Sequence, residues 1–324
     1  MFEIDSCPIK QIDLQKIDIK DTLYQISIQN NFSLLCQSIQ QMGVMHPPVL
    51  QEKALKFRII SGFQRVLACK EIGMKKISSC VVSSDILDHD CARWAVADNA
   101  AQRRLSPLEQ SRALTLLEKT LPENLTIDEI AKQMGLPATT KAIQLIYPLC
   151  HMASHIQKGI ASEYIAIPIA HALTRFSEKD ALCFTQFLEE LRAGVNIQRE
   201  LLTTCDEIAK RDNKTITDIL GSETTRTIMA QYEDDRKQRI YYIREYLKAL
   251  RYPNYSAMKN KVESRMNQLK LNNRTQLVPP PYFESDIWHL HIKFKNIKEM
   301  NDLVSDILSK ANAINTIIKQ DIYL

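Results

Sequence analysis

Hydrophobic positions along the chain follow two spacings, and the spacing changes at recognisable turn residues. Leu35 and Ile39 predict one face of a helix that ends at Gly43, because glycine favours the left-handed conformation common after helices. The run Phe57–Ile60 is rich in residues that favour a pleated surface, so it predicts a strand. It leads directly into Ser61-Gly62, after which helical spacing resumes.

A strand, a glycine turn and a helix N-terminus in succession can bind an anion. The first turn of such a helix has unpaired backbone N–H groups and the positive end of the helix dipole. Arg65, in the first turn of the predicted helix, adds a charge-assisted donor. An ordinary structural turn also contains such residues, so both interpretations stay open from this fragment alone.

The spacing then predicts a strand at Ile77–Val82, which closes a small α+β domain, and a helix over residues 86–104. That helix ends in the basic pair Arg103-Arg104. The next helix begins at residues 106–109, where a serine cap, a proline at the first helical position and a glutamate form a capping box.

Residues 126–148 predict a short helix, a glycine turn and a second helix. Thr126 and Glu129 form a capping box, and Gly135 supplies the turn. This order is typical of a helix-turn-helix, in which the second helix enters the major groove. Many helical domains contain the same turn without contacting DNA. In the DNA-binding interpretation the exposed residues of the second helix contact bases or phosphates, namely Thr139, Thr140, Lys141 and Gln144.

The remainder is predicted to be helical up to a proline-rich linker at residues 278–281. The predicted helices are residues 177–192, 195–205, 215–220, 225–251 and 256–271. Beyond the linker, Ile287–Lys295 alternates apolar and polar residues as a strand does, and an amphipathic helix follows. One or two strands and a helix cannot bury that much apolar surface alone, so this unit predicts pairing with a second copy.

The composition limits the possible functions but does not identify one. The chain has 324 residues, a charged fraction of 25% and a net charge of +4, which permits nucleic-acid binding without requiring it. No apolar run is long enough for a membrane span. The eight cysteines are scattered without a C-x-x-C pair, which favours reduced thiols in a cytoplasm over a zinc site or a disulfide framework.

The order of the N-terminal parts resembles the N-terminal domain of ParB-type partition proteins. The shared pattern is S-I-x-x-x-G, a proline pair with a short strand, then I-I-x-G-x-x-R-x-x-A, which includes Gly62, Arg65 and Ala68. The family's acidic residue after the glycine is Phe63 here, and two further arginines of its basic turn are Gln64 and Leu67 here. The acidic-Asn pair near the end of the domain corresponds to Asp98-Asn99.

This resemblance implies CTP with Mg²⁺ at the glycine turn, and DNA binding through the helix-turn-helix. The implied nucleotide-binding residues are Ser61, Gly62, Gln64, Arg65, Asp98 and Asn99, with Asp98 and Asn99 also as metal ligands. Arg103 and Arg104 join the helix-turn-helix residues as expected DNA contacts. The implied partners are double-stranded DNA, a second copy of the chain through the C-terminal unit, and a ParA-type ATPase, in a cytoplasmic, nucleoid-associated protein without a membrane partner.

The predicted fold is an α+β ParB-like domain over residues 1–104, a helix-turn-helix domain over 105–222, a helical connector over 223–277 and a small strand–helix dimerisation unit over 278–324. The predicted function is DNA binding in chromosome or plasmid partition, either as a CTP-dependent clamp with at most weak CTPase activity or as DNA binding alone. A phosphate-handling enzyme (a nuclease or kinase) on the same fold, and an adaptor or transcriptional DNA binder that uses no nucleotide, are the alternatives.

Overall fold

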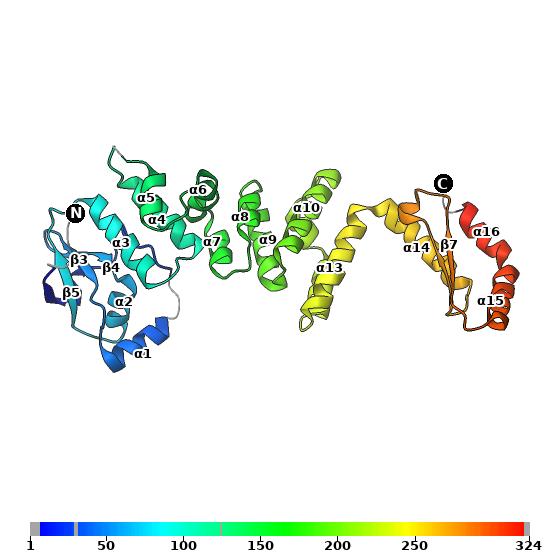
Figure 1. Ribbon diagram of the computed structural model, residues 1–324, viewed down its shortest axis with the longest axis horizontal. Coiled ribbons are helices and arrows are strands. Elements are labelled where there is room, and N and C mark those ends of the chain that lie inside the picture. The colour runs from blue at the N-terminus through cyan, green and yellow to red at the C-terminus, as the bar shows by residue number, and fades with distance from the viewer. Residues whose placement is uncertain (1–6, 29–31, 124, 321–324) are drawn as a thin grey trace. The chain divides into compact units, whose positions relative to one another are not determined.

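The computed structural model describes residues 7–28, 32–123 and 125–320. The chain divides into two compact units, Met1–Gln198 and Arg199–Leu324. Figure 1 labels their helices and strands. The expected fold class is confirmed, since a mixed sheet with helices is followed by a helical region and a small two-stranded unit. The finer division into four domains stays a prediction.

The first unit is built on a five-stranded mixed sheet in the order β1-β5-β3-β4-β2. Its strands are β1 (Ile9–Asp13), β2 (Ile17–Asp18), β3 (Val49–Glu52), β4 (Phe57–Ser61) and β5 (Lys76–Val82). The central β3 pairs in parallel with β5 and antiparallel with β4, with a register shift between Val49 and Leu50. Leu50, Ile59 and Ile60 are fully buried, so the apolar residues of β3 and β4 belong to the core of this unit.

The first helices lie beside this sheet, and the chain then continues as a helical array (Figure 1). Those next to the sheet are α1 (Phe32–Met42), α2 (Phe63–Glu71) and α3 (Asp88–Gln102). The array comprises α4 (Pro107–Lys119), α5 (Ile127–Gln133), α6 (Thr140–Ile146), α7 (Ser154–Ala161), α8 (Ile167–Leu173) and α9 (Glu178–Leu191), with a 3₁₀ turn at Tyr147–His151. Both predicted capping boxes form, at Ser106 with Glu109 and at Thr126 with Glu129.

In the second unit, several helix boundaries differ from those expected from the sequence. Its elements are the rest of α10 (Val195–Asp212), α11 (Ile216–Leu220), α12 (Glu223–Gln231), α13 (Arg236–Arg251) and α14 (Pro253–Gln268). The single helix expected over 225–251 is wrong, because the chain breaks after Gln231 and Asp235 caps a new helix by accepting a hydrogen bond from the Gln238 N–H. The helix expected to begin at residue 256 begins at Pro253, which occupies the first turn, where a missing N–H is tolerated.

The C-terminal part of this unit contains a hairpin that the sequence predicted only in half. β7 (His289–Ile292) pairs antiparallel with β6 (Thr275–Val278), which leads into the proline run. Helices α15 (Ile297–Ser309) and α16 (Ala311–Gln320) follow. Val262, Leu269, Leu277 and Ile317 form a small buried core.

The structure also joins Cys7 to Cys80 by a disulfide, which the expectation of reduced thiols did not include. Antiparallel pairing of β1 with β5 places Ile9 opposite Cys80 and so brings Cys7 near it across a sequence separation of 73 residues. No helix within the described ranges combines the length and apolar character that crossing a membrane requires.

Candidate functional site: a glycine-turn pocket and a helix-turn-helix

The turn between β4 and α2 strongly favours glycine at position 62. Gly62 precedes the first residue of α2 with a φ of 91°, a conformation that residues with a β-carbon rarely adopt. A β-carbon there would lie 2.7 Å from the Pro48 Cβ. The prediction of a strand, a tight glycine turn and a helix N-terminus is therefore confirmed as structure.

Asp98 accepts hydrogen bonds from three side chains around this turn. Arg65 Nη2 lies 3.2 Å from Asp98 Oδ2, and the Ser61 hydroxyl donates to the same oxygen. Gln102 Nε2 donates to Asp98 Oδ1 at 2.7 Å. Arg65 Nη1 also donates to the His46 carbonyl at 2.6 Å. The family resemblance implied that Ser61, Arg65 and Asp98 belong to one site, and in the structure Ser61 and Arg65 both bond to Asp98.

A cavity of about 280 Å³ lies beside this cluster. Residues from α2 and from the end of α3 line it, including Gly62, Gln64, Arg65, Asn99, Gln102 and Arg103. Both polar side-chain atoms of Gln64 are buried and, among the described residues, have no hydrogen-bond partner. The Asn99 amide donates to the Ala95 carbonyl within its own helix at 2.8 Å.

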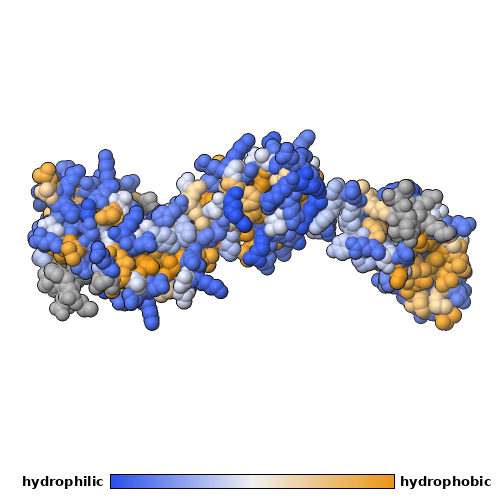
Figure 2. Space-filling view, turned by 90° about the horizontal axis from the view of Figure 1, so that it is seen from above, coloured by the Kyte–Doolittle hydropathy of each residue, from blue (hydrophilic) through white to orange (hydrophobic). Residues whose placement is uncertain are grey.

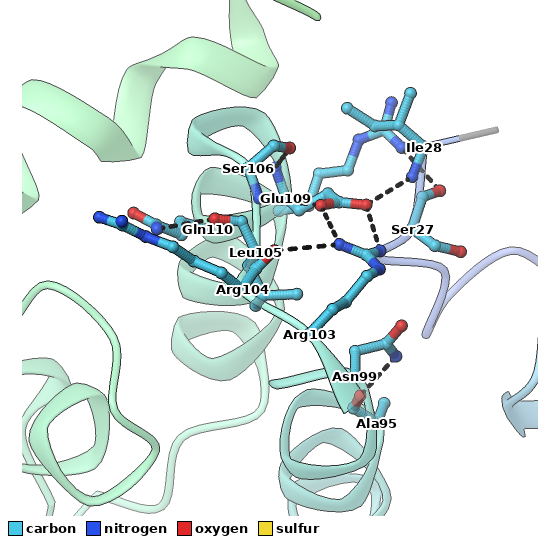
Figure 3. Close-up of polar contacts among 11 residues, drawn as sticks. Ser27, Ile28, Ala95, Asn99, Arg103, Arg104, Leu105, Ser106, Glu109 and Gln110 are labelled. Carbon is cyan, nitrogen blue, oxygen red and sulfur yellow. Dashed lines mark hydrogen bonds and ion pairs between the residues drawn. The ribbon is translucent and has the colours of Figure 1, made fainter. Parts of the chain in front are cut away.

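Arg103 makes a two-bond ion pair with Glu109 across the α3–α4 junction (Figure 3). Its Nη1 lies 2.7 Å from Glu109 Oε2, and its Nη2 lies 2.6 Å from Oε1. Glu109 also accepts hydrogen bonds from the N–H groups of Ile28 and Ser106. Its side chain is only 2% exposed, so it ties the segment before α1 to the start of α4.

These contacts determine the charge of Glu109. Burial raises the pKa of this carboxyl, but hydrogen bonds from Arg103 and from the N–H groups of Ile28 and Ser106 outweigh burial and lower the pKa to about 2. Sequence reasoning identified Glu109 only as part of a capping box. Its partner Ile28 lies 81 residues away, so no local pattern could have indicated this role.

The helix-turn-helix forms from α5, a turn and α6. Gly135 adopts a φ of 67° in the turn, and Thr139 caps α6 by accepting from the Ala142 N–H at 3.3 Å. Ile130 and Ala131 are buried, and α4 packs against both helices. The outer face of α6 is solvent-exposed along the four expected contact residues, Thr139, Thr140, Lys141 and Gln144.

The two expected basic residues outside this helix differ in their surroundings. Arg103 has a carboxylate partner and lines the glycine-turn cavity, whereas Arg104 is exposed and its carbonyl accepts a bond from Arg103. DNA contact by either of them, and by the four residues of α6, stays a prediction.

Comparison with known proteins gives a family match for the first of these sites. Residues 3–100 match the ParB N-terminal domain family. The chain is 29% identical over 188 residues to the probable chromosome-partitioning protein ParB of Chlamydia muridarum, covering 52% of this chain and 64% of that protein. It is 26% identical over 189 residues to the nucleoid occlusion protein of Halalkalibacterium halodurans, covering 58% of this chain and 62% of that protein. These matches span just under two thirds of the relatives' length.

Solved structures that this chain matches include two of the C-terminally truncated chromosome-partitioning protein ParB from Caulobacter crescentus. Its complex with the centromeric parS site is 14% identical, covers 59% of this chain and 97% of that one, and has a TM-score of 0.34. Its complex with CTP-gamma-S is 16% identical, covers 56% and 99%, and has a TM-score of 0.27. At these scores the likeness supplies no argument about sites.

Proposed function

Because the chain carries a ParB N-terminal domain, we propose that it is a DNA-binding protein of chromosome or plasmid partition. It binds double-stranded DNA through α6 and associates with the nucleoid. The single observation that carries this proposal is the exposed face of α6, which stands on a capped helix-turn-helix directly after that domain.

The chemistry of α6 suits a duplex. Lys141 supplies a charge for a phosphate, and Gln144 and the two threonines supply hydrogen-bonding groups for base edges or backbone. The side chains that hold α6 in place, such as Ile146, are buried on the opposite side. Binding by this face is largely electrostatic, so affinity falls steeply as salt rises.

The test is a gel-shift titration of the full chain with duplex DNA at low and at rising salt. We expect binding to weaken at least tenfold when Lys141→Ala and Gln144→Ala are combined, and the salt dependence to fall by about one released counterion. The matched control is Lys179→Ala with Gln186→Ala on α9, which removes the same two residue types at exposed positions and should leave binding unchanged. Absence of binding at low salt, or equal loss in both variants, would overturn the proposal.

Two partners follow from the same role. The C-terminal unit exposes large apolar side chains, and Figure 2 shows an extensive hydrophobic surface there. We propose that this surface joins two copies of the chain, which doubles the number of α6 helices available to DNA. A ParA-type ATPase is the second proposed partner, because a partition protein of this kind needs a motor to move its DNA.

Bound CTP with Mg²⁺ is implied by the family resemblance, but the residues of the glycine-turn cavity do not fit it. A triphosphate needs uncompensated cations, and both arginines that line the cavity are already paired with carboxylates. Asp98, the expected metal ligand, has both oxygens engaged by neighbouring side chains. The proposed DNA binding therefore includes no nucleotide-dependent step.

A further inference from the structure

Both arginines that line the glycine-turn cavity already have a counter-anion, supplied by a carboxylate outside the cavity lining. Arg65 pairs with Asp98 at 3.2 Å, and Arg103 pairs with Glu109 at 2.6 Å. These two arginines are the cations of the cavity lining, so the arrangement has no net positive charge to offer an incoming anion. Coulomb attraction of a polyphosphate would have to displace contacts that already satisfy both guanidinium groups.

The Asp98 carboxylate lies where it opposes anion binding most directly. It bonds to the side chain of Arg65, in the first turn of α2, and to Ser61, which immediately precedes Gly62. The backbone N–H groups and the dipole of α2 begin at that same point. A phosphate there would meet a negative charge held within hydrogen-bonding distance of the arginine that it needs.

Gln64 does not change the net charge of the glycine-turn cavity. Its amide is a neutral donor and acceptor, buried at both polar atoms and without a partner among the described residues. It can satisfy a polar group, but it adds no charge where a triphosphate carries several.

We propose that Asp98 is a built-in phosphate substitute, which pairs with Arg65 and excludes nucleoside triphosphates from the glycine-turn cavity. The α2–α3 contact is then held by the chain's own carboxylate rather than by a nucleotide and its metal. This inference concerns anion selectivity alone, so it stands or falls separately from DNA binding.

The test is calorimetric titration of the full chain with CTP and with pyrophosphate, each with and without Mg²⁺. For the unmodified chain we expect no saturable binding at millimolar ligand. The Asp98→Asn variant keeps the size of the side chain but removes its charge and frees Arg65, so we expect both anions to bind at least tenfold more tightly without Mg²⁺.

Two further variants separate charge from local disruption. Ser61→Ala removes a hydrogen bond from the same cluster but leaves Asp98 charged, so anions should stay excluded. Glu71→Gln removes a carboxylate at the exposed far end of α2 and should change nothing. Thermal unfolding of each variant confirms that it is folded, and a gel shift of Asp98→Asn reports DNA binding independently.

Two results would overturn the proposal. If the unmodified chain binds CTP with Mg²⁺ at micromolar concentration and Asp98→Asn loses that binding, Asp98 is a metal ligand rather than a barrier. If folded Asp98→Asn binds neither anion, the charge of Asp98 is not what excludes them.

Discussion

Gly62 and Pro48 approach each other so closely that only a hydrogen fits between them. A β-carbon on Gly62 would lie 2.7 Å from Pro48 Cβ and 2.9 Å from Pro48 Cα. Pro48 belongs to the proline pair that introduces β3, and Gly62 connects β4 to α2. The contact therefore fixes the turn against the neighbouring strand, and it explains why the proline pair and the glycine occur in the same motif.

We expect Gly62→Ala to lower the free energy of unfolding by about 2–4 kcal/mol, because it adds both a strained φ and an overlap with backbone that cannot move freely. Urea denaturation followed by circular dichroism measures this change. Gly194→Ala is the control, since a β-carbon there meets nothing within 4 Å, and it should change stability by less than about 0.5 kcal/mol. Equal effects of the two substitutions would contradict the packing argument.

The Arg103–Glu109 pair predicts a specific pH dependence of stability. The folded-state pKa of Glu109 is lowered to about 2, whereas an unfolded glutamate has a pKa of about 4.3. The stability that this carboxylate contributes is therefore fully present above pH about 4.3 and is lost as pH falls towards 2.

We expect Glu109→Gln to lower the free energy of unfolding at pH 7 by on the order of 2–3 kcal/mol, because it removes the buried carboxylate that accepts hydrogen bonds from Arg103 and from the N–H groups of Ile28 and Ser106. The loss should shrink as the pH of the thermal melts falls from 5 to 3. A difference between the two proteins that stays constant with pH would contradict this account. Glu123→Gln is a suitable control, because that glutamate is exposed.

Sequence reasoning succeeded where the determining signal is local. The capping boxes at Ser106 and Thr126 and the turn at Gly62 each depend on residues within three or four positions, and all three form as predicted. Sequence reasoning failed where contacts between residues far apart in the chain determine the structure. Residues Thr275–Val278 form a strand because β7 pairs with them. Glu109 connects two distant segments because the Ile28 N–H donates a hydrogen bond to it.

The missed break between α12 and α13 has a different cause. Apolar residues keep a helical spacing through this region, as with Ile228, Tyr232 and Ile240, so periodicity alone predicts a continuous helix. Asp235 ends that continuity by capping Gln238, and the Tyr232 ring stacks on the Tyr242 ring at 4.5 Å. A single capping aspartate therefore outweighed the longer pattern.

The exposed apolar face of the C-terminal unit provides the last test, of pairing between two copies. Ile297 and Leu308 are 66% and 67% exposed and lie eleven residues apart on α15, which places them on the same face of the helix. Leu290 and Phe294, in and just after β7, are also exposed. A unit with so small a core of its own and so much apolar surface gains stability by covering that surface.

We expect the full chain to be a dimer in analytical ultracentrifugation. Ile297→Lys combined with Leu308→Lys should raise the dissociation constant of that dimer at least tenfold. Two lysines placed in an apolar contact are desolvated without partners, which opposes association. Asp302→Lys adds a lysine at an exposed polar position of the same helix and should leave the dimer intact. A monomeric unmodified chain, or a dimer that survives the double substitution, would show that this face does not join the copies. If the dimer does dissociate, the gel shift of the double variant should also weaken, because a dimer presents two α6 helices to one duplex and a monomer only one.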